Sequence, residues 1–563
     1  MVLVLSPNGE YTKLATLEEA RTSAFVAGKT VVVTTPQVVT TAIAWPGDRV
    51  LKFEGGGYVT FSGAGTLTGL KESRPQWFNA KGDGTTDDTA ALQATFNAAT
   101  PGVGGTIPVH PWAAEVFFPP GNYKITNTLN VPRGISIKGT NARTHSGCTI
   151  QQVTSDEFIF DLYGVLYDTN RRTADQKISG FKFISAGGAI RAMSTDYPGI
   201  TMSIGSLTIT DNHFINIDGG YAIYTDAHIE NVSNNTFDYC AIGHIKAGGG
   251  RITNNMFFEA TSGAIVIDTD YLPTDYGYVP TIIATNEFIG NGSASSTDPL
   301  KAAVAFIGSS TIYSTLITGN TFSGLSTGAG SVGIQSSVNV GFIGLNLSNN
   351  VFSQLAGNAI SLSHVKYSNI SNNVVASCGN TVLGTNVMNF VTDSIGNSLV
   401  NNSFYNNGGS YNIAFGGTSS DNSISQTKQD VYRVSLPTGT ATMADYSEGV
   451  FTPQVTFGDV NVSTTPSDCK YVRMGKSVNM SCSVAFNRGT QTGTMKILGF
   501  PFTLVGLNRL DIISGITIPT GYSGMFFNGS DTTCYFCGPS GPATVNESNV
   551  TTGTLQINFN GIL

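Results

Sequence analysis

The clearest pattern of apolar and polar positions in this chain is an Asn-x-Phe element that recurs through its middle. Copies begin at Asn212, Asn235, Asn255, Asn286, Asn320, Asn350, Asn373 and Asn402, and the copy at Asn373 has Val in place of Phe. The interval between copies runs from 20 residues, Asn235 to Asn255, to 34 residues, Asn286 to Asn320. Several copies are followed by an Ala-Ile pair that opens a short alternating stretch, at Ala222, Ala241, Ala264 and Ala359. Each interval is therefore predicted to hold two or more short strands joined by turns.

Such a repeat predicts a solenoid of stacked β-coils, because one strand of each coil can lie on the equivalent strand of the coil before. The Phe and Ile side chains then point inward at the two-residue period of a strand. Coils stack about 4.8 Å apart, so an Asn at the same turn of every coil can hydrogen-bond along the axis. Asn also tolerates the left-handed conformation of tight corners. Variable intervals place insertions at the corners, on the outside of an all-β parallel helix.

A second set of motifs lies upstream of the repeat. The run Gly82 to Asp88 leads into a helix beginning at Thr89, and Asp83, Asp87 and Asp88 are expected to cap that helix and its turn. The sequence Phe117-Phe-Pro-Pro-Gly-Asn-Tyr123 follows. With Trp77-Phe78 before them, these motifs resemble the start of the pectate-lyase-like β-helix superfamily in the form carried by bacteriophage tailspikes. Together with the repeat, the resemblance covers about residues 77 to 430.

This resemblance implies a right-handed, single-stranded parallel β-helix in a homotrimeric virion protein. Its partners would be a bacterial surface polysaccharide and, through the N-terminus, a phage tail or baseplate protein. Residues 1–76, with a helix candidate from Leu14 to Ala27, are expected to form a neck and first coils, and residues 77–435 the β-helix. Alternating strands after Asp430, such as Val478 to Phe486, predict a C-terminal β-sandwich over residues 436–563. They resemble domains of phage tail proteins that assist trimerisation and sometimes bind sugar.

Composition narrows the function classes. The chain has 563 residues, 66 of them Gly, only 12% charged residues and a net charge of −8. No basic stripe is present, which argues against nucleic acid as a partner. No apolar run approaches the roughly 20 residues of a membrane span, and no secretion signal is expected. Seven scattered cysteines and six dispersed histidines argue against a disulfide framework and a metal cluster, so no cofactor is expected.

Carboxylates are the better chemical lead, since glycosidic hydrolysis uses one carboxylic acid as proton donor and a second carboxylate as base or nucleophile. Alignment of coils on the Ala-Ile pairs places Asp226, Ile245 and Asp268 in one column, with His244 and Lys246 flanking Ile245. Asp270 would follow on the same face at roughly 6.5 to 7 Å if the strand persists. Glu259 is expected at the preceding corner, near Asp238. The catalytic candidates are thus Asp226, Glu259, Asp268 and Asp270.

An insertion after Asp268 supplies candidate sugar contacts. It carries Tyr271, Asp275, Tyr276 and Tyr278 within thirteen residues. Aromatic faces stack on sugar rings and carboxylates hold hydroxyl groups, so this loop is the leading candidate for a saccharide cleft. The remaining substrate-binding candidates are Tyr239, His244, Lys246 and Arg251.

The alternatives stay open on sequence alone. Surface acids are often only solvated, and Asp238, Asp275, Glu287 or Asp393 could supply the carboxylates instead. Three functions fit: an endo-glycosidase, a non-catalytic adhesin that only binds, or a polysaccharide lyase. In the lyase, His244, Lys246 or a Tyr would remove a proton while Arg251 or Lys246 neutralises a uronate. A trimer could also assemble its site between subunits.

Overall fold

The chain was analysed as a computed structural model that divides into two compact units. One unit comprises Met1–Ser419 with Ser425–Pro437, and the other Ser420–Ile424 with Thr438–Leu563. The structure describes residues 1–6, 9–100, 114–132, 134–140, 147–162, 176–192, 207–225, 229–240, 243–247, 249–259, 263–271, 280–290, 300, 302–324, 332–379, 386–408, 411–425, 428–429, 434–435, 447–450, 452–458, 460–474, 477–492, 494–498, 507–516, 524–528, 534–537, 543–544 and 550–562.

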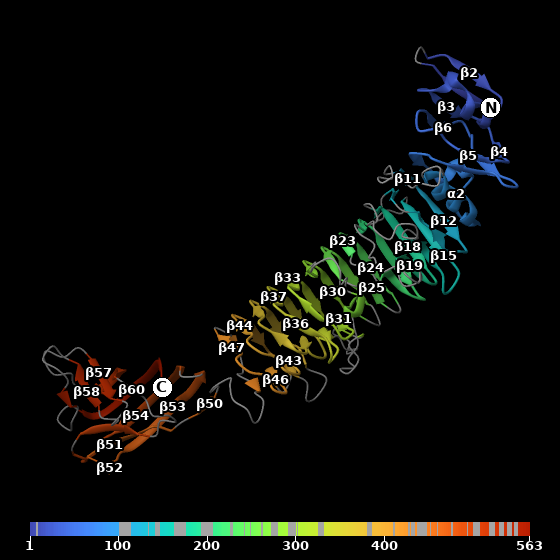
Figure 1. Cartoon of the computed structure of the whole chain (residues 1–563). Helices are drawn as coiled ribbons and strands as arrows, with labels where there is room; N and C mark the ends of the chain where they lie inside the picture. Colours follow the sequence, from blue (N-terminus) through green and yellow to red (C-terminus); the bar gives the residue numbers. More distant parts are fainter. Residues whose placement is uncertain are drawn as a thin grey trace. The chain divides into compact units, whose positions relative to one another are not determined.

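Within the first unit, three long parallel sheets form the right-handed parallel β-helix expected from the repeat together with the family resemblance (Figure 1). Sheet I consists of β10 (Asp83–Asp87), β12 (Gly121–Ile125), β15 (Cys148–Gln152), β18 (Phe181–Ser185), β21 (His213–Ile217), β24 (Thr236–Asp238), β27 (Met256–Phe258), β30 (Glu287–Ile289), β34 (Thr321–Ser323), β38 (Val351–Ser353), β42 (Val374–Ala376), β45 (Ser403–Tyr405) and β48 (Lys428–Gln429). Sheet II consists of β13 (Leu129–Asn130), β16 (Phe158–Asp161), β19 (Gly188–Ala192), β22 (Tyr221–Thr225), β25 (Gly243–Ala247), β28 (Ile265–Asp268), β31 (Ala302–Ile307), β35 (Val332–Ser336), β39 (Ile360–Leu362), β43 (Asn386–Phe390), β46 (Tyr411–Phe415) and β49 (Val434–Ser435).

Sheet III completes each coil and precedes the sheet I strand of that coil. It includes β9 (Glu72–Ser73), β11 (Ala114–Phe118), β14 (Ile135–Gly139), β17 (Gln176–Ser179), β20 (Leu207–Thr210), β23 (Ile229–Ser233), β26 (Gly250–Thr253), β29 (Ile282–Ala284), β33 (Leu316–Thr318), β37 (Asn346–Ser348), β41 (Asn369–Ser371) and β44 (Ser398–Val400). Three later coils add a short parallel sheet of β32 (Thr311–Tyr313), β36 (Gly341–Ile343) and β40 (Val365–Lys366).

The Asn-x-Phe pattern forms two ladders inside the β-helix. Phe rings of successive sheet I strands stack with centroids 4.6 to 4.9 Å apart, from Phe214 to Phe352. Each Asn side-chain amide, from Asn212 to Asn373, donates to the Oδ1 of the next Asn at 2.9 to 3.1 Å. The left-handed residue is the one before each ladder Asn, for example Asn254 with φ 56°. The predicted ladder is therefore confirmed, but the corner conformation belongs to its neighbour.

The helix predicted at Thr89 is α2 (Thr89–Ala99), and it covers the first coil. Its Phe96 ring contacts Phe118 and Phe160, with centroids 6.1 and 5.7 Å away, so it closes the apolar core at this end. The Asp87 carboxylate accepts the Thr89 backbone N–H at 3.0 Å, which satisfies a free donor of the first turn. Asp88 accepts the N–H groups of residues 81 and 82, and burial raises the pKa of its carboxyl. These contacts fit the capping role expected for the acids.

The first residues form small β-structures around one short helix. Strands β2 (Tyr11–Leu14), β1 (Val2–Leu5), β3 (Thr30–Val33) and β6 (Val50–Phe53) make one sheet, β4 (Gln37–Val39) pairs with β7 (Val59–Phe61), and β5 (Ala42–Ala44) pairs with β8 (Thr66–Thr68). The predicted helix over 14–27 is shorter: α1 spans Leu17–Thr22, followed by the 3-10 turns η1 (Ala24–Val26) and later η2 (Pro75–Phe78).

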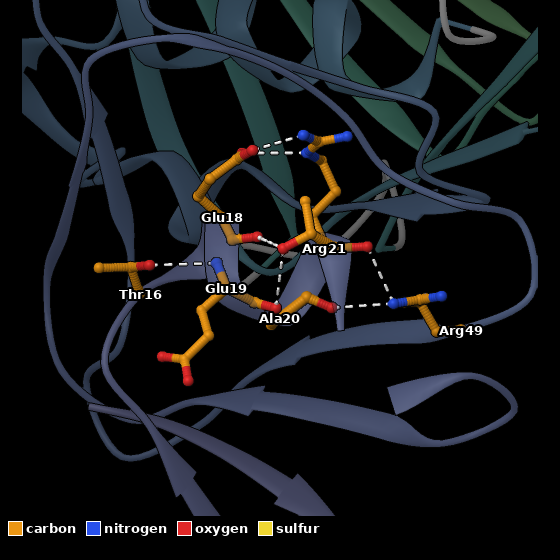
Figure 2. Close-up of polar contacts among 7 residues, drawn as sticks. Thr16, Glu18, Glu19, Ala20, Arg21 and Arg49 are labelled. Carbon is orange, nitrogen blue, oxygen red and sulfur yellow. Dashed lines mark hydrogen bonds and ion pairs between the residues drawn. The ribbon is translucent and has the colours of Figure 1, made fainter. Parts of the chain in front are cut away.

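Arg49 explains why this helix ends where it does. One guanidinium nitrogen of Arg49 donates to the carbonyl groups of Ala20 and Arg21 at 2.9 and 3.0 Å (Figure 2). The same nitrogen donates to the Ser23 carbonyl at 3.1 Å. These are carbonyls that have no partner within a helix that stops here, so Arg49 caps the C-terminus of α1. At the other end, the Thr16 hydroxyl accepts the Glu19 N–H at 3.1 Å.

The second unit is antiparallel. One sheet has the order β50 (Ser447–Val450), β53 (Ser463–Met474), β54 (Ser477–Asn487), β60 (Val550–Ile562), β56 (Leu507–Ile516), β57 (Gly524–Asn528), β58 (Cys534–Cys537) and β59 (Ala543–Thr544). The other has β52 (Val460–Asn461), β51 (Gln454–Phe457) and β55 (Met495–Leu498). Phe457 contacts Phe486 of the larger sheet, with ring centroids 6.4 Å apart. Cys469 and Cys482 form a disulfide, which the cysteine count did not predict. The full β-sandwich stays a prediction.

Candidate functional site

The structure separates the residues that the sequence grouped together. His244, Lys246 and Asp268 lie on sheet II strands, whereas Arg251 lies on β26 of sheet III. Glu259 and Tyr239 follow the ends of sheet I strands β27 and β24. Four candidates fall outside the described residues: Asp226, Asp275, Tyr276 and Tyr278. The lyase arrangement of His244, Lys246 and Arg251 stays a prediction, with Arg251 on the sheet III strand that directly follows β25 in the chain.

Ile245 does not share a column with Asp268, so the predicted column of Asp226, Ile245 and Asp268 is wrong at Ile245. Ile245 pairs with Ile223 and Ile265 of the neighbouring coils, and all three side chains are fully buried. Asp268 lies three residues beyond Ile265 and pairs with Ile307. The Ala241-Ile242 pair imitated the Ala-Ile element of other coils, but β25 begins only at Gly243. The register is therefore shifted by three residues at this coil.

Asp270 does not continue the strand that ends at Asp268. Residues Thr269–Tyr271 form a 3-10 turn, η3, so the expected spacing along one strand is wrong. The Asp270 Oδ1 accepts hydrogen bonds from Ser309 N and Oγ at 2.8 and 3.0 Å, and Asp270 N donates to Asp268 Oδ1 at 3.3 Å. The Asp268 side chain is only 8% exposed. These contacts give both carboxylates a place in holding the corner between β28 and the next coil.

Two other carboxylates lie at an accessible corner of sheet I. Asp238 ends β24, and its register partner in the next coil is Phe258, the residue directly before Glu259. From a strand separation of about 4.8 Å and a rise of about 3.3 Å, the Cα atoms of Asp238 and Glu259 lie about 6 Å apart. Both side chains are partly exposed. Their backbone placement suits the carboxyl separations of roughly 5 to 9.5 Å that glycosidases use.

His213 holds one of these carboxylates. Its Nε2 lies 2.9 Å from the Asp238 Oδ2, and both side chains are about one-fifth exposed, at 20% and 21%. His213 belongs to β21, the strand that precedes β24 in sheet I, so the pair reaches diagonally from coil to coil. Lys182 of β18 is the register partner of His213 on the other side. Sequence inspection passed over His213 because its partner is 25 residues away, although both flank inward Phe positions and so face outward.

The turn after each strand exposes the neighbouring side chains. Tyr239 and Glu259 both adopt left-handed backbone conformations, with φ of 50° and 45°, and they occupy equivalent corners of successive coils. Tyr239 is 58% exposed. We call His213, Asp238, Tyr239 and Glu259 the corner site. It offers the two carboxylates that glycosidic hydrolysis uses, together with an imidazole that can orient one of them and an exposed aromatic ring.

A separate group lies on sheet II, on β16, β19 and β22. Phe158 stacks on Tyr224 and Tyr224 on Tyr221, with centroids 6.4 and 5.8 Å apart. Arg191 lies over the Phe158 ring at 5.3 Å and donates from Nε to Asp161 Oδ2 at 3.1 Å. We call these five residues the aromatic platform. No linear motif predicts this cluster, because its members come from three coils separated by insertions.

No group of three His, Cys, Asp or Glu side chains within the described segments is arranged to hold a metal ion. Likewise, none of the described helices is both long enough and apolar enough to cross a membrane.

Comparison with known proteins gives one family match and several structural ones. Residues 76–271 match the family model "Rhamnogalacturonase A/epimerase, pectate lyase-like", which confirms the pectate-lyase-like resemblance for that segment. The crystal structure of Dettilon tailspike protein gp208 is similar at 14% identity and a TM-score of 0.46, covering 87% of this chain and 94% of that one. ORF18 of Geobacillus virus E2 is similar at 14% identity and a TM-score of 0.36, covering 84% of this chain and 86% of that one. DFA-IIIase of Arthrobacter chlorophenolicus A6 without its lid is similar at 12% identity and a TM-score of 0.43, covering 66% of this chain and 100% of that one. No curated protein matches the chain.

Proposed function

We propose that this protein is a phage tailspike that binds a bacterial surface polysaccharide and cleaves it by endo-glycosidic hydrolysis at the corner site. The observation that carries the proposal is the placement of Asp238 and Glu259 on adjacent coils, with His213 bonded to Asp238. The family match over residues 76–271 supports a carbohydrate substrate, because its description names a rhamnogalacturonase and an epimerase. The virion location rests on the tailspike-like motifs of the sequence.

In this mechanism the two carboxyl groups take different roles. Glu259, at the exposed corner, donates a proton to the leaving glycosidic oxygen. Asp238, oriented by the imidazole of His213, either attacks the anomeric carbon or takes a proton from the attacking water. Tyr239 offers its exposed ring to an adjacent sugar. The separation of the two carboxyl groups in the sugar complex decides between retention and inversion.

The test is to incubate the protein with purified capsule and O-antigen preparations and to measure the mass of the products. Hydrolysis adds one water per cleaved bond. Asp238→Asn and Glu259→Gln should each lower the cleavage rate by about 10²- to 10⁴-fold, the usual contribution of a positioned acid or base. Glu115→Gln is the matched control, since Glu115 is an exposed acid on the sheet III strand β11 and belongs to no candidate site. Full activity in both corner variants would overturn the assignment.

The candidates from sequence stay part of this proposal as competing catalysts. Asp268→Asn, Asp270→Asn and Asp226→Asn belong in the same assay, together with alanine variants of the predicted sugar contacts Tyr271, Asp275, Tyr276 and Tyr278. We expect Asp268 and Asp270 to affect stability more than chemistry, because their described contacts lie within the corner. Loss of cleavage in Asp268→Asn with unchanged thermal unfolding would move the catalytic site to sheet II.

A lyase is the second candidate, and a specific observation favours it. His213 lies between Lys182 and Asp238 on three successive sheet I strands. An imidazole oriented by a carboxylate can remove a proton, and a lysine can neutralise the uronate carboxylate beside it. β-Elimination leaves an unsaturated product that absorbs ultraviolet light and carries no added water. That product would replace the hydrolase proposal, and unchanged polysaccharide would leave a binding adhesin.

The assembly is proposed from the same resemblance. We propose a homotrimer attached through residues 1–76 to a phage tail or baseplate protein. Light scattering should give three times the chain mass of 59.1 kDa. A monomeric mass at micromolar concentration would contradict it.

A further inference from the structure

The aromatic platform lies on three adjacent strands of sheet II. Phe158, Gly188 and Tyr221 occupy equivalent register positions on β16, β19 and β22. A Cβ on Gly188 would lie 2.2 Å from the Phe158 ring, so only glycine leaves room for that ring over β19. The space lets Phe158 approach Tyr224 two strands away, with ring planes 20° apart. Tyr221 and Tyr224 are likewise near parallel, at 26°.

An ion pair lies three residues further along the same strands. Asp161, Arg191 and Tyr224 are direct register partners across the same three strands. Arg191 reaches Asp161 with two guanidinium nitrogens, and its side chain remains 35% exposed against 12% for Asp161. The guanidinium also lies over Phe158. Arg191 therefore presents fixed N–H donors beside near-parallel ring planes, and Asp161 presents acceptor oxygens.

These groups match the two surfaces of a sugar unit. The partly exposed rings can pack against the apolar C–H face of a pyranose, while the arginine and carboxylate hydrogen-bond its hydroxyl groups. The charge of Arg191 is already balanced by Asp161, and a uronate carboxylate placed here would meet the Asp161 carboxylate at close range. Like charges brought together in a binding site are unfavourable. The chemistry therefore favours a neutral sugar over an acidic one.

The platform lies near the corner site along the coil. Strand β21, which carries His213, ends at Ile217, and β22 begins four residues later at Tyr221. The corner between sheets I and II is thus all that separates the two groups in that coil. A polysaccharide bound at one can extend to the other.

We infer that the aromatic platform is a binding subsite for a neutral, uncharged sugar unit of the polysaccharide that the corner site cleaves. The inference rests on the proposed function for the identity of the ligand as a glycan. It assigns the substrate class: a polysaccharide whose repeat contains at least one neutral sugar.

The experiment measures binding apart from cleavage. Glu259→Gln protein is applied to an array of purified bacterial capsule and O-antigen oligosaccharides, and each bound glycan is titrated by calorimetry. Phe158→Ala and Tyr224→Ala in this background should weaken binding about three- to tenfold, as expected for loss of one aromatic contact. Tyr411→Ala is the control, because Tyr411 is an exposed tyrosine on sheet II strand β46, away from the platform.

Charge preference gives the second readout. A uronate-containing oligosaccharide and its carboxyl-reduced form are compared, and the neutral form should bind more tightly. Asp161→Asn should reduce that preference, because it removes the repelling carboxylate while Arg191 remains. Circular dichroism verifies that each variant keeps the fold.

The outcomes separate the two proposals. Unchanged affinity in both ring variants, tighter binding of the acidic form, or no bound glycan on the array would overturn the platform. If the ring variants bind more weakly and the neutral form is preferred, but the unmodified protein cleaves no glycan, only the proposed hydrolysis is overturned.

Discussion

Replacing Asn286 with alanine tests how much the Asn ladder stabilises the β-helix. Asn286 is 2% exposed and occupies the middle of the ladder. Its amide nitrogen donates to Ile252 O at 2.8 Å and to Asn320 Oδ1 at 3.0 Å. Its Oδ1 accepts from the backbone N and the side-chain amide of Asn255 at 3.0 and 3.1 Å. Four side-chain hydrogen bonds are lost together.

The size of the effect follows from these four contacts. A buried hydrogen bond contributes about 1 kcal/mol net, and a buried group left without a partner costs about 1 to 3 kcal/mol. The Asn255 backbone N–H carries most of the cost of a buried group without a partner, because it donates to the oxygen that the substitution removes. We therefore expect the free energy of unfolding of the β-helix to fall by about 4 kcal/mol.

Urea unfolding followed by circular dichroism measures this change. The control is Asn346→Ala, since Asn346 is an exposed asparagine on the outer face of β37, and surface changes of this kind usually stay within about 0.5 kcal/mol. Refolding from urea must reproduce the transition, because large β-proteins can unfold irreversibly. A loss below about 1 kcal/mol for Asn286→Ala would refute the reasoning that the ladder stabilises the coils.

Three further results are expected. Phe288→Ala removes a fully buried ring from the stack and should cost about 3 to 5 kcal/mol of stability in the same assay. Asp393 accepts a hydrogen bond from the Thr418 hydroxyl, and this bond lowers the pKa of the Asp393 carboxyl. The ionised carboxylate therefore stabilises the folded protein above about pH 4, and this stabilisation is lost as the pH falls through the lowered pKa. Asp393→Asn should therefore flatten the acid limb of the stability–pH curve, and an unchanged limb would contradict that role. Glu259→Gln should lose cleavage while keeping its thermal transition, as followed by product mass and calorimetry.

The fold was predictable from sequence because its signal repeats. Each Asn-x-Phe copy places one buried amide and, except at Val375, one buried ring, and Asp87 accepts the first N–H group of α2. The site was less predictable, because registration between coils decides which side chains meet. Alignment on the Ala241-Ile242 pair placed Ile245 beside Asp268. The strand begins only at Gly243, and Ile245 pairs with Ile223 and Ile265 instead.

Diagonal contacts were the other limit. His213 and Asp238 meet because they lie two residues apart along the strand direction in adjacent coils, and no linear motif records that relation. The platform residues meet for a similar reason, with Gly188 providing the space. Such contacts depend on the lengths of the corners between strands, which vary from coil to coil.

The Asn ladder keeps the register between coils constant although the coils differ in length. Successive rungs are 20 to 34 residues apart along the chain, yet their amide contacts stay within 2.9 to 3.1 Å. A corner can therefore gain or lose a dozen residues while the strands above and below keep their partners. A corner segment between two rungs can therefore be replaced by one of different length without any change to the buried core.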